Sequence, residues 1–261
     1  MKKIIIPALL LMGSVSNAQM KEGKVVYERT IQMNRIQDPE IAARVPRERK
    51  ENFELMFGNN QSLWQVIPNA DGTDNNTISG PGFMMRMAGS NDITYINFEK
   101  GQRVDQREMF DREFLVEDSI TKLNWKLTGE TNTILNYPVQ KAVAERVGSR
   151  MVMSMENGEM KRQQVADTSY IIAWFTSNIP VPAGPPEFQG QLPGLILELT
   201  INNGRTVFKA VEISPKVNVA SIKEPKGGKR MSTAEFNKER ERLLEEMQKN
   251  NPGGNRVIRM N

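Results

Sequence analysis

The side chains of this sequence that could carry chemistry are thioethers and carboxylates, because the chain has no Cys and no His. A Ser-His-Asp triad, a Cys nucleophile, a His/Cys zinc site and a His- or Cys-ligated haem are therefore excluded. Disulfides are excluded too, so the stability of the fold must come from a hydrophobic core. We expect no cofactor.

Two groups stand out among the 16 methionines. Met151, Met153 and Met155 alternate, so a strand would place their thioethers on one face. A second group follows Phe83 in the run Phe-Met-Met-Arg-Met. Soft thioethers select Cu(I), which makes a Met-rich, Cu(I)-handling protein one alternative and Met151, Met153 and Met155 its candidate ligands. The other interpretation is that methionine fills an irregular core.

Carboxylates are numerous, but their spacing indicates no catalytic pair. A two-carboxylate hydrolase is a further alternative. Nothing in the spacing favours it over solvated strand faces, so we predict that the protein is not an enzyme. The sequence also lacks a Gly-rich phosphate loop, an EF-hand and an aromatic-basic nucleic-acid signature, and we expect no nucleic-acid partner. The scattered acidic residues are Asp92, Glu108, Asp111, Glu113 and Asp118.

The first 18 residues are typical of a cleaved secretory signal. Lys2 and Lys3 precede an apolar run, 4–12, that is too short to span a bilayer, which needs about 20 apolar residues. Small residues then end at Ala18, which predicts cleavage before Gln19. We expect a periplasmic or secreted protein with no transmembrane segment after cleavage. A membrane anchor is the alternative.

The body, residues 19–213, is predicted to be all-β. Phe53, Leu55 and Phe57 recur at every second position, as in a half-buried strand. Turn formers separate many such short segments, for example 58–60, 148–149, 157–158 and 202–204. This pattern predicts an antiparallel meander that forms a curved half-barrel or a sandwich. A short helix over 34–50 and an exposed loop over 68–82 are expected between strands.

Residues 214–261 are predicted to form a basic extension with 11 basic and 6 acidic side chains. Residues 214–231 contain two Pro and two Gly and are expected to be a mobile connector. Ser232 and Glu235 then form a capping box for an amphipathic helix over 232–249. Its polar face mixes both charges, which argues against a membrane-surface helix.

The segment 170–199 combines two apolar strands with a stiff loop. Pro180, Pro182, Pro185, Pro186 and Pro193 fix φ, while Gly184, Gly190 and Gly194 permit conformations closed to other residues. The loop therefore holds its apolar side chains in place. The strand that follows is apolar on one face and carries Glu198 on the other.

This segment resembles the GLPGLI family of exported proteins from Bacteroidetes. The resemblance rests on Leu192-Pro193-Gly194-Leu195-Ile196, on Ala173-Trp174-Phe175-Thr176 upstream of it, and on Trp125-Lys126-Leu127 with Gln140-Lys141-Ala142. Gln191 stands at the place of the first Gly in the motif, although Gly190 precedes it. Asn136 and Val139 stand where many members have Gly and Cys. The resemblance implies an exported protein that accompanies a TonB-dependent outer-membrane transporter.

Together these features predict a periplasmic or outer-membrane-associated accessory or binding protein. The loop would shape the rim of an apolar concavity that takes a hydrophobic ligand, a peptide or an outer-membrane transporter. The alternative is that the loop only packs one end of the sheet. The predicted binding residues are Trp174, Pro180, Gly184, Pro185, Phe188, Leu192, Pro193, Gly194 and Glu198.

Overall fold

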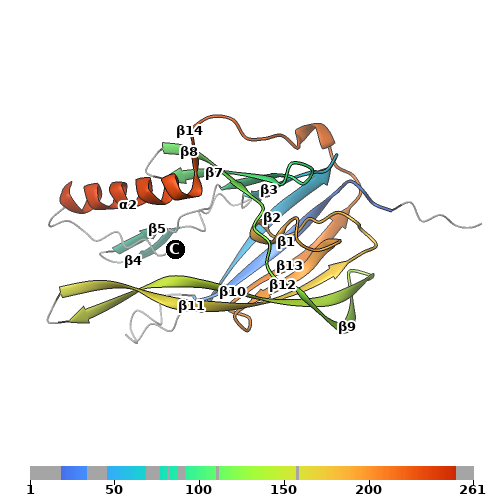
Figure 1. The fold of residues 1–261 in the computed structure, drawn as a ribbon, viewed down its shortest axis with the longest axis horizontal. Coiled ribbons are helices and arrows are strands. Elements are labelled where there is room, and N and C mark those ends of the chain that lie inside the picture. Colours follow the sequence, from blue (N-terminus) through green and yellow to red (C-terminus); the bar gives the residue numbers. More distant parts are fainter. Residues whose placement is uncertain are drawn as a thin grey trace, which may run out of the picture.

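The computed structural model describes residues 19–33, 46–68, 77–80, 83–86, 92–109, 112–156 and 159–250. Within these residues, twelve strands form one open sheet in the order β14-β8-β7-β6-β3-β2-β1-β13-β12-β11-β10-β9 (Figure 1). Its first half along the chain comprises β1 (Gly23–Gln32), β2 (Glu48–Gly58), β3 (Gln61–Val66), β6 (Ile93–Asn97), β7 (Gln102–Met109) and β8 (Arg112–Ser119). The second half comprises β9 (Lys126–Ile134), β10 (Tyr137–Glu156), β11 (Glu159–Thr176), β12 (Leu195–Ile201), β13 (Thr206–Ser214) and β14 (Lys229–Ser232).

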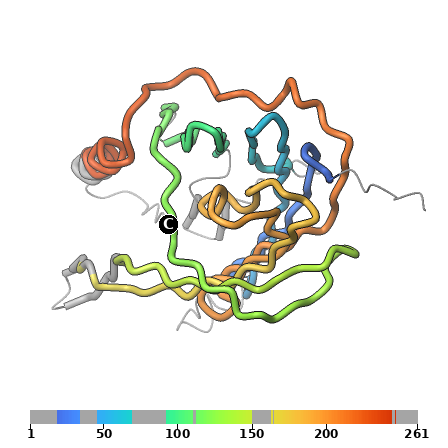
Figure 2. The backbone as a smooth tube through the Cα atoms, turned by 45° about the vertical axis from the view of Figure 1, so that its right-hand side comes forward, coloured from blue at the N-terminus to red at the C-terminus, as the bar shows by residue number. Residues whose placement is uncertain are grey.

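The sheet consists of two antiparallel meanders that meet in its middle. The first runs from β1 outward to β8 at one side. The chain then crosses to the opposite edge, and the second meander returns from β9 to β13, which pairs with β1. β14 pairs with β8 in parallel. The predicted all-β fold with a curved antiparallel meander and a C-terminal helix is thus confirmed, and Figure 2 shows how the sheet curves around its contents.

Alternation of side chains gives the sheet two distinct faces. Val25 and Tyr27 on β1, and Phe53, Leu55 and Phe57 on β2, are buried in one cluster with the loop between β11 and β12. We call the face that carries this cluster the concave face. Positions between them point to the convex face, where Met56 packs with Leu63, Val104 and Leu115 in a second cluster. A Gly58-Asn59-Asn60 turn joins β2 to β3, with positive φ at both asparagines.

The loop over 177–194 folds back onto the concave face and fills it. Ile179, Ala183, Phe188 and Leu192 are at most 5% exposed and belong to the main core cluster. The loop pairs with the strand that follows it, because the amides of Leu195 and Ile196 donate to the carbonyls of Ile179 and Ala183 at 3.1 and 3.0 Å. The short 3₁₀ helix η1 (Pro186–Phe188) lies within this loop.

The segment 120–125, which crosses from β8 to β9, lies against the outer side of the loop. The side-chain carbonyl of Gln191 accepts hydrogen bonds from the amide of Leu123 and the indole N–H of Trp125, both at 3.0 Å. The Trp125 ring packs edge-on against Phe188 at 6.3 Å between centroids. The loop is therefore held between the sheet and this crossing, as Figure 2 shows.

The C-terminal extension wraps around the β8 side of the sheet. Residues 217–222, including the 3₁₀ helix η2 (Val219–Ser221), pack on the convex face, where Ile222 is 4% exposed. The expected connector thus contacts the sheet. After β14, helix α2 (Thr233–Asn250) packs Phe236 and Leu243 against Phe114, Val116, Met109 and Met231.

The predicted capping box begins this helix. The Glu235 carboxylate accepts from the Ser232 amide at 2.8 Å, and the Glu235 amide donates to the Ser232 hydroxyl at 3.3 Å. Thr233 Oγ1 also donates to Asp118 on β8 at 2.7 Å, which ties the helix to the sheet. No helix among the residues described is long and apolar enough to cross a membrane.

Three local predictions are wrong. Gly148 and Ser149 do not form a turn but lie inside β10, where they pair with Asp167 and Ala166 of β11. β10 and β11 are therefore one long hairpin, whose outer part extends beyond the pairings with β9 and β12 (Figure 1). Residues 48–50, expected in a helix, begin β2, while the rest of that prediction, at 34–45, lies outside the described residues. Within the loop expected at 68–82, Thr77–Gly80 forms β4, which pairs with β5 (Phe83–Arg86).

We predict that Gly194→Ala destabilises the protein by about 3 kcal/mol or more, measured by urea unfolding. A Cβ at this position would lie 2.1 Å from the Thr176 carbonyl oxygen, a backbone atom that strand pairing holds in place. Gly148→Ala is the matched control, since a Cβ there meets nothing within 4 Å. Equal stability of the two variants would contradict the close contact.

Candidate functional site

The predicted binding residues do not form one site. Among those in the loop, Gly184, Pro185, Phe188, Leu192 and Gly194 are buried, whereas Pro180 and Pro193 are exposed. A Cβ at Gly184 would meet Ile196 at 2.8 Å, so this glycine permits close packing. The loop therefore covers the apolar part of the concave face with its own side chains.

Trp174 and Glu198 lie on the opposite face from the loop. Their neighbours Ala173, Phe175, Leu197 and Leu199 are at most 1% exposed in the main core, so the two intervening residues point to the convex face. They are cross-strand partners on β11 and β12, and the Lys141 ammonium lies 5.9 Å from the Trp174 ring centroid. Trp174 is partly buried and packs against the main core, but Trp174, Glu198 and the loop residues do not share one face and do not form one site.

Two buried polar groups anchor the loop on the concave face. Ser62 on β3 donates to the side-chain carbonyl of Gln189 at 2.6 Å, and both residues are at most 1% exposed. The Tyr27 hydroxyl donates to the carbonyl of Ile196. Burial raises the pKa of Tyr27, so the hydroxyl stays a neutral donor. These contacts hold the loop against the concave face, where it packs as part of the core.

Beside the loop, the concave face carries a set of buried and half-buried charges that we call the charged strip. The strip consists of Arg29, Arg49, Glu51, Asp92, Arg103, Asp105 and Arg107. Its first carboxylate is Glu51 on β2, which is 6% exposed and ion-paired with both Arg29 and Arg49. The Arg29 guanidinium also stacks on Phe53, at 4.7 Å from the ring centroid.

The second carboxylate is Asp105 on β7, which is 5% exposed. Its Oδ1 accepts from Thr94 Oγ1 at 2.8 Å and Arg103 Nε at 3.0 Å, and its Oδ2 lies 3.0 and 3.1 Å from nitrogens of Arg103 and Arg107. Burial alone would raise the pKa of Asp105, but the two arginines and the hydrogen bonds hold it below its ordinary value. Asp105 is therefore an ionised group whose oxygens are fully engaged.

Asp92, immediately before β6, lies between these two groups. Burial raises its pKa from 3.8 to about 6; Arg107 and Arg29 act in the opposite direction, and the Asp105 charge adds to the increase. The strip thus contains one carboxyl with a raised pKa next to one with a lowered pKa. Of the scattered acidic residues of the sequence, Asp92 takes this place, Asp118 accepts from Thr233, and Asp111 lies outside the described residues.

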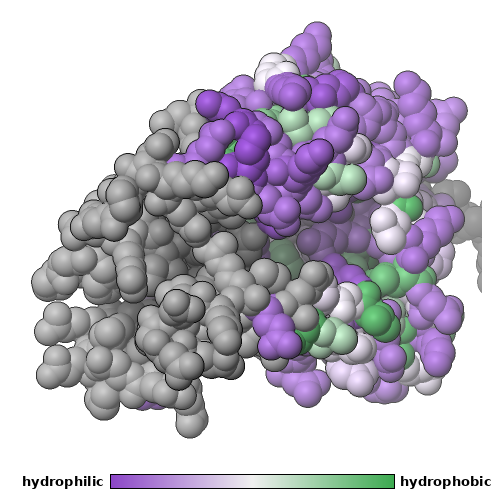
Figure 3. Space-filling view, turned by 60° about the vertical axis from the view of Figure 1, so that its left-hand side comes forward, coloured by the Kyte–Doolittle hydropathy of each residue, from purple (hydrophilic) through white to green (hydrophobic). Residues whose placement is uncertain are grey.

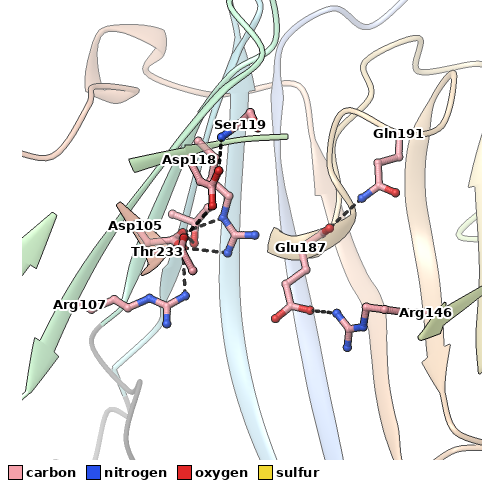
Figure 4. Close-up of polar contacts among 10 residues, drawn as sticks. Asp105, Arg107, Asp118, Ser119, Arg146, Glu187, Gln191 and Thr233 are labelled. Atoms are coloured by element: carbon pink, nitrogen blue, oxygen red, sulfur yellow. Dashed lines mark hydrogen bonds and ion pairs between the residues drawn. The ribbon is translucent and has the colours of Figure 1, made fainter. Parts of the chain in front are cut away.

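A third ion pair lies opposite the strip. Arg146, near the base of the β10–β11 hairpin, pairs with Glu187 of the loop and lies 5.9 Å from the Phe188 ring centroid. Figure 4 shows this pair on one side and Asp105 with Arg107 on the other, with strands of the sheet passing behind. Figure 3 shows the surface receding between the α2 side and the hairpin side, with hydrophilic residues visible inside.

Sequence reasoning missed the strip, although a signal was present. Arg103, Asp105 and Arg107 alternate along one strand, as do Arg49 and Glu51, which places opposite charges on the same face. The alternation shows each local group. It does not show that β2 and β7 share one face, or that the loop leaves them uncovered.

The metal hypothesis stays a hypothesis. Met151, Met153 and Met155 lie on β10, but the structure does not describe their side chains. No group of three or more His, Cys, Asp or Glu in the described part of the chain could hold a metal ion.

Part of the chain matches a protein family whose function is unknown. Residues 125–198 match a family described as a protein of unknown function (Porph_ging). It is a domain found in Bacteroidetes-type proteins. The match runs from the crossing through the β10–β11 hairpin and the loop into β12, so it contains Arg146 and Glu187 but not the charged strip. No curated protein matches the chain.

Solved structures share the fold of this chain. Two structures titled as PNGF-II, in space groups C2 and P21, are each 16% identical to it over 83% and 84% of its length, with TM-scores of 0.51 and 0.50. The aligned region is 32% of each of those chains, so this chain spans about a third of their length. At this identity the likeness concerns the fold alone.

We predict that Asp92→Asn stabilises the protein at pH 7.5 by about 1–3 kcal/mol and has little effect at pH 4. The folded-state pKa of about 6 exceeds the ordinary 3.8, so the folded state binds the proton more tightly. The contribution to stability is present below about pH 4 and is lost as pH rises through 6. An asparagine cannot ionise, so the variant does not lose this stability at high pH. Urea unfolding of both proteins at both pH values measures it, and equal stabilisation at pH 4 and 7.5 would contradict the assignment.

Proposed function

We propose that this chain is an exported accessory protein that binds its partner on the concave face, at the charged strip between the loop and α2. The strip is the observation that carries the proposal. Charges are costly to bury, and a fold that needed only stability would be served as well by apolar residues there. The described loop and helix cover apolar parts of the same face and leave Arg29 and Arg107 partly exposed, at 26% and 37% of their side chains.

Binding is favoured over hydrolysis by the state of Asp105. The raised pKa of Asp92 beside the lowered pKa of Asp105 is a pattern that hydrolases use. A nucleophile or general base, however, needs a lone pair that faces its substrate or water. Both Asp105 oxygens are occupied by Thr94 and two arginines, so the pair lacks a second reacting carboxylate.

Export and the identity of the partner are proposed from the sequence. The predicted signal and the resemblance to GLPGLI proteins support a periplasmic or outer-membrane location and a TonB-dependent transporter as partner. Cleavage before Gln19 would leave β1 intact, since this strand begins at Gly23.

We predict that protein recovered from the cell envelope begins at Gln19, as determined by N-terminal sequencing. Signal peptidase requires small residues before the cut, so Ala18→Arg is expected to accumulate uncleaved precursor. An intact Met1 in the envelope fraction of the unaltered protein would instead support the anchor alternative.

For the partner, we predict that immobilised full-length mature protein captures an outer-membrane transporter from solubilised native membranes, identified by mass spectrometry. Arg146→Ala should abolish recovery, because this residue borders the site and is 40% exposed. The matched control is Arg230→Ala, which removes an ion-paired arginine of 47% exposure from β14. Its cross-strand partner Leu115 points to the convex face.

Recovery of no transporter, or equal recovery with both variants, would count against the proposal. Point variants are preferable to deletion of residues 214–261. Such a deletion would uncover the apolar clusters under Ile222 and Phe236 and would create adhesive surface unrelated to the site.

A further inference from the structure

Three arginines of the concave side share one arrangement. Each guanidinium is ion-paired with a carboxylate and lies over a phenylalanine ring. Arg29 pairs with Glu51 and lies over Phe53; Arg107 pairs with Asp105 and lies 5.4 Å from the Phe236 centroid; Arg146 pairs with Glu187 and lies over Phe188. The three side chains are 26%, 37% and 40% exposed.

The rings come from the three parts of the molecule that border the site. Phe53 belongs to the sheet, Phe236 to α2 and Phe188 to the loop. A guanidinium that stacks on a ring has a fixed plane and loses little further freedom when it binds. Its planar fork of donors matches a carboxylate in a two-point contact. The arrangement therefore suits recognition as well as packing.

The strip also holds more positive than negative charge. Glu51 and Asp105 each have two arginine partners, so each group keeps one positive charge in excess. Asp92 offsets one of these charges when it is ionised. Asp118, at the margin of the strip, accepts a hydrogen bond from Thr233. Four arginines against Glu51, Asp105 and ionised Asp92 leave the strip one positive charge, and protonation of Asp92 leaves it two, so the strip favours a ligand of negative charge.

The positions of the arginines along the sheet favour an extended ligand. β7 and β1 are four strand steps apart, as are β1 and β10. At about 4.8 Å per step, each interval is roughly 19 Å along the sheet, or roughly six residues of extended peptide. An extended ligand could follow the sheet from one arginine to the next.

Resting on the function proposed above, we infer that the ligand of the concave face is an acidic, extended peptide segment of the partner, whose carboxylates bind Arg29, Arg107 and Arg146. Asp92 occupies the position between Arg107 and Arg29 and competes with the carboxylates of the ligand. Protonation of Asp92 removes this competition. The groups that face it are Arg107 and Asp105 on β7, Arg29 on β1 and the backbone of Glu108.

The test uses a fluorescein-labelled peptide of about fourteen glutamates, long enough to span both intervals of roughly 19 Å. Fluorescence anisotropy with the full mature protein at low salt should show saturable binding. Arg107→Gln and Arg146→Gln should each weaken it roughly tenfold, whereas the control Arg230→Gln should change it by less than about twofold. Binding to the unaltered protein should strengthen as the pH falls from 7.5 to 5.5. Asp92→Asn should bind the peptide more tightly than the unaltered protein at pH 7.5 and should show no such change with pH.

The gain with Asp92→Asn keeps the test sharp, because a variant that fails to fold cannot bind more tightly. No saturable binding, equal loss with Arg230→Gln, or equal binding of a lysine peptide would overturn the inference. If a transporter is captured in an Arg146-dependent manner but the glutamate peptide does not bind, the ligand class is wrong and the proposed function stands. If the peptide binds as expected but no transporter is recovered, the ligand class stands and the proposed transporter partner is wrong.

Discussion

Gly194 lies so close to the carbonyl of Thr176 that no side chain fits between them, and the packing of the loop over 177–194 depends on this contact. The contact lets the chain turn back at the end of β11, so that residues 177–194 lie on the concave face instead of extending into solvent. Hydrogen bonds from Leu195 and Ile196 of β12 hold the loop backbone, and the loop adds apolar side chains to the core. A sheet of this curvature would otherwise have to close on itself to bury its inner face.

Filling the concave face in this way determines where charge can lie. The loop covers one part of that face, and Phe236 and Leu243 of α2 cover another. Glu51 and Asp105 lie on the same face beside these apolar groups. Their burial would be unfavourable if each had a single weak partner, and each is in fact held by two arginines.

The sequence predicted the elements better than the site. Alternation at Phe53, Leu55 and Phe57 and the asparagine turn after them are local signals, and both hold in the structure. The Gly148-Ser149 turn was also a local signal, but continued pairing with Asp167 and Ala166 outweighs it. Stiffness of the loop followed from its prolines. Its role as packing did not, because a buried plug and the rim of a pocket require the same apolar and prolyl residues.

The charged strip could not be predicted from any one segment, because it depends on strand order. Glu51 on β2 and Asp105 on β7 share a face only because β3 and β6 lie between them in register, and Asp92 comes between the arginines for the same reason. Trp174 and Glu198 show the opposite case. They are close to the loop in sequence, but alternation on β11 and β12 places them on the other face.

The segment that matches a family of unknown function and the strip that lies outside it meet across the same opening. Residues 125–198 contribute the loop, the hairpin and the Arg146–Glu187 pair, whereas β1, β2, β7 and Asp92 before β6 contribute the strip. The matched segment on its own would present one wall with balanced charge. The excess of positive charge arises from the strip, which lies in the part of the chain outside the match.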